Sequence, residues 1–174
     1  YSVIEDYEAA ILDYRKAIET SGFSYSEKRR SFKSAYLRDI VNTRAAAFNN
    51  IAVFQLKLDR KDLAVEAYEE ALANYEENER IIGSAPYCRV VAGYGELLKQ
   101  DKKYEKAIEV LTRHKAKNIH LASGVFVLTG DIYVLMGEKE KAIEKYNEAI
   151  EMRKLAKRKY EDIDKKIEEL QKKE

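Results

Sequence analysis

Residues 139–150 read KEKAIEKYNEAI, and related strings occur three more times along the chain. Residues 104–115 read YEKAIEVLTRHK, residues 61–72 read KDLAVEAYEEAL, and residues 7–18 read YEAAILDYRKAI. Each string has alanine at its fourth position, and further small or bulky residues follow at offsets of four and three, which lie on one helical face. The pattern predicts four helices that pack through alternating small and bulky side chains. The aligned residues are Ala10, Tyr14 and Ala17; Ala64, Tyr68 and Ala71; Ala107, Leu111 and His114; and Ala142, Tyr146 and Ala149.

A second helical pattern precedes three of these strings. Its members combine bulky residues with a small or medium-sized central residue: Phe126, Thr129, Gly130 and Tyr133; Val91, Tyr94, Gly95 and Leu98; and Phe48, Ile51, Ala52 and Gln55. Short polar turns at 59–62, 100–103 and 137–139 then lead into the strings. The chain is therefore predicted to consist of antiparallel helix pairs with short connections.

These paired patterns resemble the tetratricopeptide repeat, a helix–turn–helix unit of about 34 residues. The likeness covers residues 1–20 and 45–155. It implies an all-α fold, a right-handed superhelical solenoid of antiparallel helix pairs. The chain departs from the family pattern where each repeat normally ends in proline, since Glu76, Ile119 and Lys154 stand there instead.

The expected organisation is a single domain over residues 1–174. Its predicted parts are the second helix of a half-repeat at 1–22, a helical extension at 24–44, repeats at 45–83, 86–118 and 119–151, and a capping helix at 152–174. The extension is predicted to lengthen the helix that contains Phe48, because Phe32, Ala35, Tyr36 and Ile40 form an apolar stripe.

The charged tail from Met152 onward is predicted to form one long C-terminal helix. Its apolar residues have the spacing of a heptad seam about two heptads long. They are Ala156, Tyr160, Ile163, Ile167 and Leu170. One interpretation is a helix that covers the last apolar face, as repeat arrays require. The alternative is a seam for self-association, which would give a homodimer, or for binding a partner.

The composition excludes several classes of protein. The 174 residues include 32 Lys and Arg against 31 Asp and Glu, so the basic excess of a nucleic-acid module is absent. With 7 Gly and 1 Pro the chain lacks the turn residues of a β-sandwich or barrel. No apolar run approaches the roughly 18 residues of a membrane-spanning helix, so membrane insertion is not expected.

Residues that carry catalytic or metal chemistry are sparse. His114 and His120 are six positions apart, whereas two ligands on one helical face need a spacing of about four. Cys88 has no sequence signature of a nucleophile and is predicted to be a buried thiol. Without a phosphate-binding glycine loop or a hydrolase motif, the sequence predicts no enzyme, no metal and no cofactor.

Two other groups of residues are interpreted as structural. The basic clusters 28–30 and 157–159 are each followed by acidic residues, which favours solvated helix faces over RNA contact. Several of the 13 tyrosines stand at core positions of the repeats and are predicted to pack rather than to stack on a ligand. These are Tyr14, Tyr68, Tyr94, Tyr133 and Tyr146.

By the resemblance, the first helix of each pair lines a concave groove. The groove positions are Ala46, Asn49, Val53 and Leu56; Arg89, Ala92, Glu96 and Lys99; and Gly124, Val127, Asp131 and Val134. The candidate partner-binding residues are Asn49, Val53, Arg89, Glu96, Lys99, Val127 and Asp131. A peptide is the expected ligand, with Arg89 and Lys99 binding its acidic groups and Asp131 a basic group.

Co-chaperone members of the family hold a C-terminal carboxylate in a clamp of Lys, Asn and Arg. Of that clamp only Asn50 and Arg89 are present here, so a chaperone tail is not the expected ligand.

The predicted function is a non-enzymatic scaffold that binds a protein or peptide partner. The alternative is a regulatory or assembly domain of a larger sensor, secretion or envelope protein, which binds a small ligand or self-associates through the C-terminal helix. The chain starts at Tyr1 rather than at a methionine. A cytoplasmic location is favoured, and attachment to the cell envelope is the alternative if an upstream signal was removed.

Overall fold

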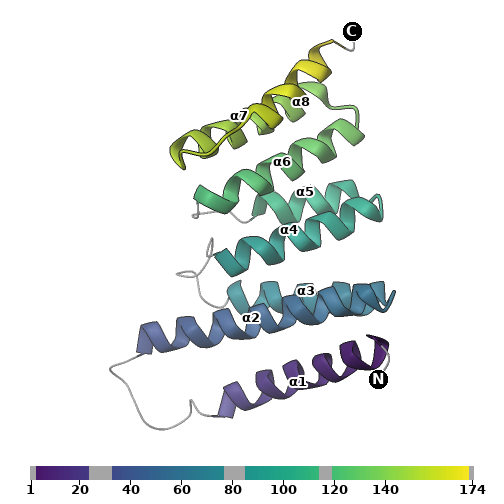
Figure 1. The fold of residues 1–174 in the computed structure, drawn as a ribbon, viewed down its shortest axis with the longest axis vertical. Helices are drawn as coiled ribbons and strands as arrows, with labels where there is room; N and C mark the ends of the chain where they lie inside the picture. Colours follow the sequence, from purple (N-terminus) through teal and green to yellow (C-terminus); the bar gives the residue numbers. More distant parts are fainter. Residues whose placement is uncertain (1–2, 24–32, 77–84, 114–118, 173–174) are drawn as a thin grey trace. The chain divides into compact units, whose positions relative to one another are not determined.

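The computed structural model describes residues 3–23, 33–76, 85–113 and 119–172, which form helices and turns without any strand (Figure 1). The helices are α1 (Val3–Phe23), α2 (Lys33–Lys57), α3 (Lys61–Glu76), α4 (Ala85–Gln100), α5 (Tyr104–Arg113), α6 (Ile119–Leu135), α7 (Lys139–Leu155) and α8 (Glu161–Gln171). The predicted all-α class is confirmed. Contacts divide the chain into two compact units, Tyr1–Ile82 and Gly83–Glu174. The single domain over 1–174 stays a prediction.

The first unit contains α1, α2 and α3. Helix α2 begins at Lys33, so residues 33–44 extend the helix that contains Phe48, as predicted. Residues 24–32 of the predicted extension, and 77–83 of the first repeat, lie outside the described residues. Ala64 and Ala71 of α3 are fully buried against α2.

Helix α1 packs on α2 through a face that includes Tyr14, as predicted, but that is rotated away from Ala10 and Ala17. Ile11 and Ile18 are its buried residues, whereas Ala17 is exposed and Ala10 only half-buried. The ring of Tyr7 stacks on Phe54 of α2 with centroids 5.4 Å apart. The prediction that Ala10 and Ala17 share the buried positions of the other strings is therefore wrong, because the isoleucines supply more apolar area to the α2 contact.

The second unit contains the pairs α4–α5 and α6–α7, followed by α8. Pairing within it depends on close approaches between a small and a large residue. A Cβ placed on Gly95 of α4 would lie 2.7 Å from Cδ2 of Leu111 in α5. A Cβ placed on Gly130 of α6 would lie 2.6 Å from Cε1 of Tyr146 in α7. The predicted register of both pairs is confirmed, with Ala107, Ala142 and Ala149 fully buried.

Among the helix ends that the structure describes, four share one turn. The Arg60 N–H donates to the Gln55 carbonyl at 2.8 Å, and the Asp59 N–H donates to the Leu56 carbonyl at 3.1 Å. This is the Schellman motif, in which one residue has a positive φ. The same pattern ends α4, α6 and α7, and the residues with positive φ are Asp59, Lys102, Gly137 and Lys157.

The last of these turns corrects the prediction for the tail. The expected helix over 152–174 is interrupted, because α7 ends at Leu155 and α8 begins at Glu161. A heptad seam from Ala156 to Leu170 on one long helix is therefore wrong. Instead α8 folds back and inserts Ile163, fully buried, among Ala142, Tyr146, Ala149 and Ile150 of α7. Burying this residue outweighs the left-handed backbone of Lys157, which costs roughly 1–2 kcal/mol.

None of the helices in the described part of the chain is both long and apolar enough to cross a membrane.

Candidate functional site

Helix α4 leaves one stripe of side chains uncovered within its unit. Arg89 is exposed, and Glu96 and Lys99 are half-buried, while the neighbouring Val90, Leu97 and Leu98 are buried. Nζ of Lys99 lies 2.7 Å from a carboxylate oxygen of Glu96, one helical turn away. This stripe therefore presents an ion pair and, toward the N-terminal end of the helix, a separate guanidinium group.

On α6 the two predicted binding residues are half-buried, although Gly124 and Val134 of the same stripe are exposed. Val127 is half-buried and packs against the cluster formed by α7 and α8. Asp131 is half-buried and already carries two polar partners. Val127 therefore contributes to the core, and Asp131 is occupied by groups of its own unit.

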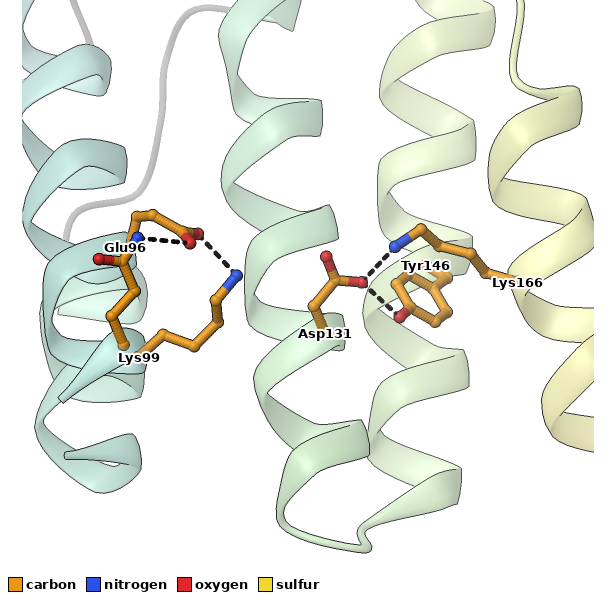
Figure 2. A network of polar contacts seen from close by, with 6 residues as sticks. Glu96, Lys99, Asp131, Tyr146 and Lys166 are labelled. Carbon is orange, nitrogen blue, oxygen red and sulfur yellow. Dashed lines mark hydrogen bonds and ion pairs between the residues drawn. The ribbon is translucent and has the colours of Figure 1, made fainter. Parts of the chain in front are cut away.

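Those two partners come from α7 and α8 (Figure 2). The Tyr146 hydroxyl donates to Oδ1 of Asp131 at 2.7 Å, and Nζ of Lys166 lies 2.6 Å from the same oxygen. The Lys166 ammonium also lies 5.6 Å from the centroid of the Tyr146 ring, within range of a cation–π interaction. Burial, and then the hydrogen bond to Asp131, raise the pKa of the Tyr146 hydroxyl. The phenol therefore remains the proton donor at neutral pH.

Figure 2 shows this network beside the α4 stripe, with Glu96 and Lys99 on one helix and Asp131 on the next. The three helices α4, α6 and α8 thus each contribute charged side chains within the second unit. Four of these charges are paired, as Glu96 with Lys99 and as Asp131 with Lys166.

The remaining predicted site residues belong to the first unit. Asn49 is half-buried and Val53 is exposed on α2. The neighbouring Asn50, considered for a carboxylate clamp, donates through Nδ2 to the Tyr14 hydroxyl at 2.9 Å. Asn50 therefore helps to fix α1 on α2.

The structure describes some of the residues that were considered for catalysis, metal binding or RNA contact. Cys88 is buried as predicted, and burial raises the pKa of its thiol. His114, the side chain of His120 and the basic cluster 28–30 lie outside the described residues. Among the residues that are described, no group of three or more His, Cys, Asp or Glu side chains is placed to hold a metal ion.

Comparison with a protein family agrees with this helix pairing. Residues 45–78 and 125–154 match the family model of the tetratricopeptide repeat. These two segments carry tetratricopeptide repeats. The matched segments contain the α2–α3 and α6–α7 helix pairs, and the α4–α5 pair between them has the same helix–turn–helix construction. No curated protein sequence matches the chain.

Solved structures with a similar fold share little sequence with the chain. BtubC (BKLC) from P. vanneervenii has a TM-score of 0.59 at 20% identity, over 86% of this chain and 56% of that one. The pilF protein of Pseudomonas aeruginosa has a TM-score of 0.54 at 22% identity, over 86% of this chain and 62% of that one. This chain therefore spans less than two thirds of the length of either structure.

Five of the predicted binding residues lie in the second unit, namely Arg89, Glu96, Lys99, Val127 and Asp131, while Asn49 and Val53 lie in the first. Sequence reasoning missed Lys166, which reaches Asp131 from α8. One signal for it exists. Lys166 is three residues after Ile163 and four before Leu170, so it lies beside the apolar stripe that anchors α8.

Proposed function

We propose that this chain is a non-enzymatic module that binds a protein partner as a peptide segment, along the uncovered faces of the first helices of its repeats. Tetratricopeptide repeats are protein-interaction scaffolds, and solenoids of this kind use an extended surface for binding. The proposal rests mainly on the α4 stripe. Arg89 is exposed and Ala92, Glu96 and Lys99 are half-buried, whereas the large apolar side chains of the same helix are buried.

The charges of this stripe favour acidic groups in the partner. Arg89 is exposed and, within the described part of the chain, has no ion pair. Lys99 is paired with Glu96, and exposed or partly exposed pairs of this kind are worth at most about 1 kcal/mol, so a partner carboxylate can compete for the lysine. Arg89 and Lys99 are ten residues apart on one helix, about 15 Å along its axis, so each would bind a separate acidic group of the partner through charge-assisted contacts.

The proposal can be tested with peptides selected against the immobilised chain from a random display library. Their affinity would be measured by fluorescence anisotropy for the unaltered chain and for the double variant Arg89→Glu, Lys99→Glu. We expect the double variant to lose binding by about 100-fold or more, since binding energy concentrates in a few residues. Circular dichroism should show unchanged helicity.

A matched control is Arg15→Glu with Lys16→Glu, which makes the same change in net charge at two exposed residues of α1. Binding should survive in this variant. Peptides that bind both double variants as tightly as the unaltered chain would contradict the proposed surface.

The alternative is a regulatory or assembly domain of a larger protein, which binds a small ligand or self-associates through the C-terminal helix. Sedimentation equilibrium tests the self-association, because a dimerising chain gains apparent mass with concentration and a peptide-binding module remains a monomer.

A further inference from the structure

An open hollow of about 280 Å³ lies where α6, α7 and α8 meet. Its apolar lining comes from Val134 and Leu135 at the end of α6 and from Leu170 of α8. Its polar lining is Asp131, Tyr146, Lys166 and Glu169. All of these residues belong to the second unit, so the hollow is formed by one compact body.

The apolar part of this hollow is unusually accessible. Val134 is 38% exposed and Leu135 is 56% exposed. Few other large apolar side chains are exposed in the part of the chain that the structure describes. Apolar residues gathered in one place and rimmed by polar groups are typical of interaction sites, whereas single exposed leucines are common everywhere. Leu135, Val134 and Leu170 lie together beside polar groups, so they have the arrangement that is typical of an interaction site.

The polar rim has a defined sign. Lys166 and Asp131 neutralise one another, with 2.6 Å between Nζ and Oδ1. Glu169 is exposed and forms no ion pair within the part of the chain that the structure describes. One negative charge therefore remains uncompensated at the edge of an apolar surface.

The size of the hollow argues against a small-molecule cofactor. Ligand pockets usually measure about 300–1,000 Å³ and enclose most of their ligand. This hollow is at the lower end of that range and is open to solvent, which suits a single side chain inserted by a larger partner.

We propose that this hollow holds an aliphatic side chain of the partner peptide, and that a lysine or arginine next to it in that peptide pairs with Glu169. This inference rests on the proposed function, because it names a second contact point for the same peptide. The partner segment would then carry acidic groups for the α4 stripe and an aliphatic–basic pair for the hollow. The residue of the peptide next to the aliphatic one is basic, because a positive charge would complement the unpaired carboxylate of Glu169.

The test uses three acetylated and amidated dipeptides, leucyl-lysine, leucyl-glutamate and alanyl-lysine, titrated into the isotopically labelled chain. Chemical-shift changes in two-dimensional NMR spectra report the position and strength of binding. We expect leucyl-lysine to shift the signals of Val134, Leu135, Glu169 and Leu170. Alanyl-lysine should bind about ten-fold more weakly, because it buries about three fewer carbon atoms.

Charge reversal provides the sharper comparison. Glu169→Lys should weaken leucyl-lysine binding about two- to five-fold and strengthen leucyl-glutamate binding by a similar factor, as expected for an exposed ion pair. The matched control is Glu168→Lys, which makes the same charge change at the adjacent exposed residue, outside the hollow. It should leave both affinities unchanged.

Two outcomes would overturn the inference. In the first, leucyl-lysine shifts no signals of the hollow, or Glu169→Lys and Glu168→Lys behave alike. In the second, the signals of the hollow broaden with protein concentration and Leu135→Glu removes this effect, which would make a second copy of the chain the occupant. Neither outcome depends on Arg89 or Lys99. Loss of peptide binding in the Arg89→Glu, Lys99→Glu variant would therefore still support the proposed function if the hollow fails.

Discussion

The ring of Tyr146 occupies the space that a β-carbon at Gly130 would need, since an ideal Cβ there would lie 2.6 Å from Cε1 of the ring. Gly130 therefore lets α7 approach α6 closely, and the approach places the Tyr146 hydroxyl 2.7 Å from Asp131, the next residue of α6. A packing detail of the repeat thus positions a polar group of the candidate site.

Replacing Gly130 by alanine should destabilise the second unit. The added methyl group meets a rigid aromatic ring, so overpacking should cost about 1–3 kcal/mol of unfolding free energy. Gly124→Ala is the matched control on the same helix, where an added Cβ meets nothing within 4 Å. That variant should be stabilised by about 0.5–1 kcal/mol, because alanine is the better helix former. Urea denaturation of both variants measures the difference, and equal effects would contradict the packing described here.

The contact of α8 with α7 depends on Ile163. This side chain is fully buried, so Ile163→Ala should lower the free energy of unfolding by about 2–4 kcal/mol. Leu155→Ala, at a residue 65% exposed just before the turn, should change it by less than about 0.5 kcal/mol. Thermal melts followed by circular dichroism would detect both. If α7 instead continued as one straight helix to the C-terminal end, both side chains would be exposed and both substitutions would change the free energy of unfolding by a similarly small amount.

Tyr146→Phe should give a pH-dependent loss of stability. At pH 8 the variant lacks the hydrogen bond to Asp131 and should be less stable by roughly 1–3 kcal/mol. The pKa of Tyr146 is raised in the folded chain, and an unfolded tyrosine has a pKa of about 10. Its stabilising contribution is therefore complete below about pH 9 and falls as the pH rises further.

The free-energy difference between the two proteins should narrow by roughly 0.8 kcal/mol between pH 8 and pH 10.5, because only the unaltered chain has the Tyr146 phenol, which loses its proton on unfolding. Guanidinium denaturation at the two pH values provides the measurement. A constant or widening difference would show that the phenol is not protected in the folded state.

The buried thiol of Cys88 should react slowly. Burial keeps it protonated, and the thiolate is the reactive species. Its reaction with an aromatic disulfide at pH 8 should be on the order of 100-fold slower in the folded chain than in urea, since access requires local opening. An equal rate in both conditions would place this thiol at the surface.

The helix pairs were predictable because their information is local. Ala142, Tyr146 and Ala149 follow the spacing of one helical face, and the structure buries all three. Local information also explains the error in α1. Its string matches the repeat pattern, but the pattern does not reveal that Ile11 and Ile18 are the residues buried against α2.

The candidate site was only partly predictable. Asp131 was identified from its repeat position, but its partner Lys166 lies 35 residues away and reaches it only because the chain turns back after α7. Neither glycine nor proline marks that turn, so the local sequence favours continuing the helix. Contacts between distant residues, which a pattern along the chain does not contain, decide where α8 lies.

The turn at Lys157 has a consequence for what happens when α8 detaches from α7. Its left-handed residue, Lys157 with a φ of 52°, is held by the hydrogen bonds of the Schellman motif, by the ion pair of Arg153 with Asp162 and by burial of Ile163. If α8 loses its hold on α7, residues 156–160 are free to become helical. The direction of residues 161–171 would then change as a whole, carrying Lys166 and Glu169 with them. Burial of Ile163 therefore helps to set the direction of the whole segment 161–171.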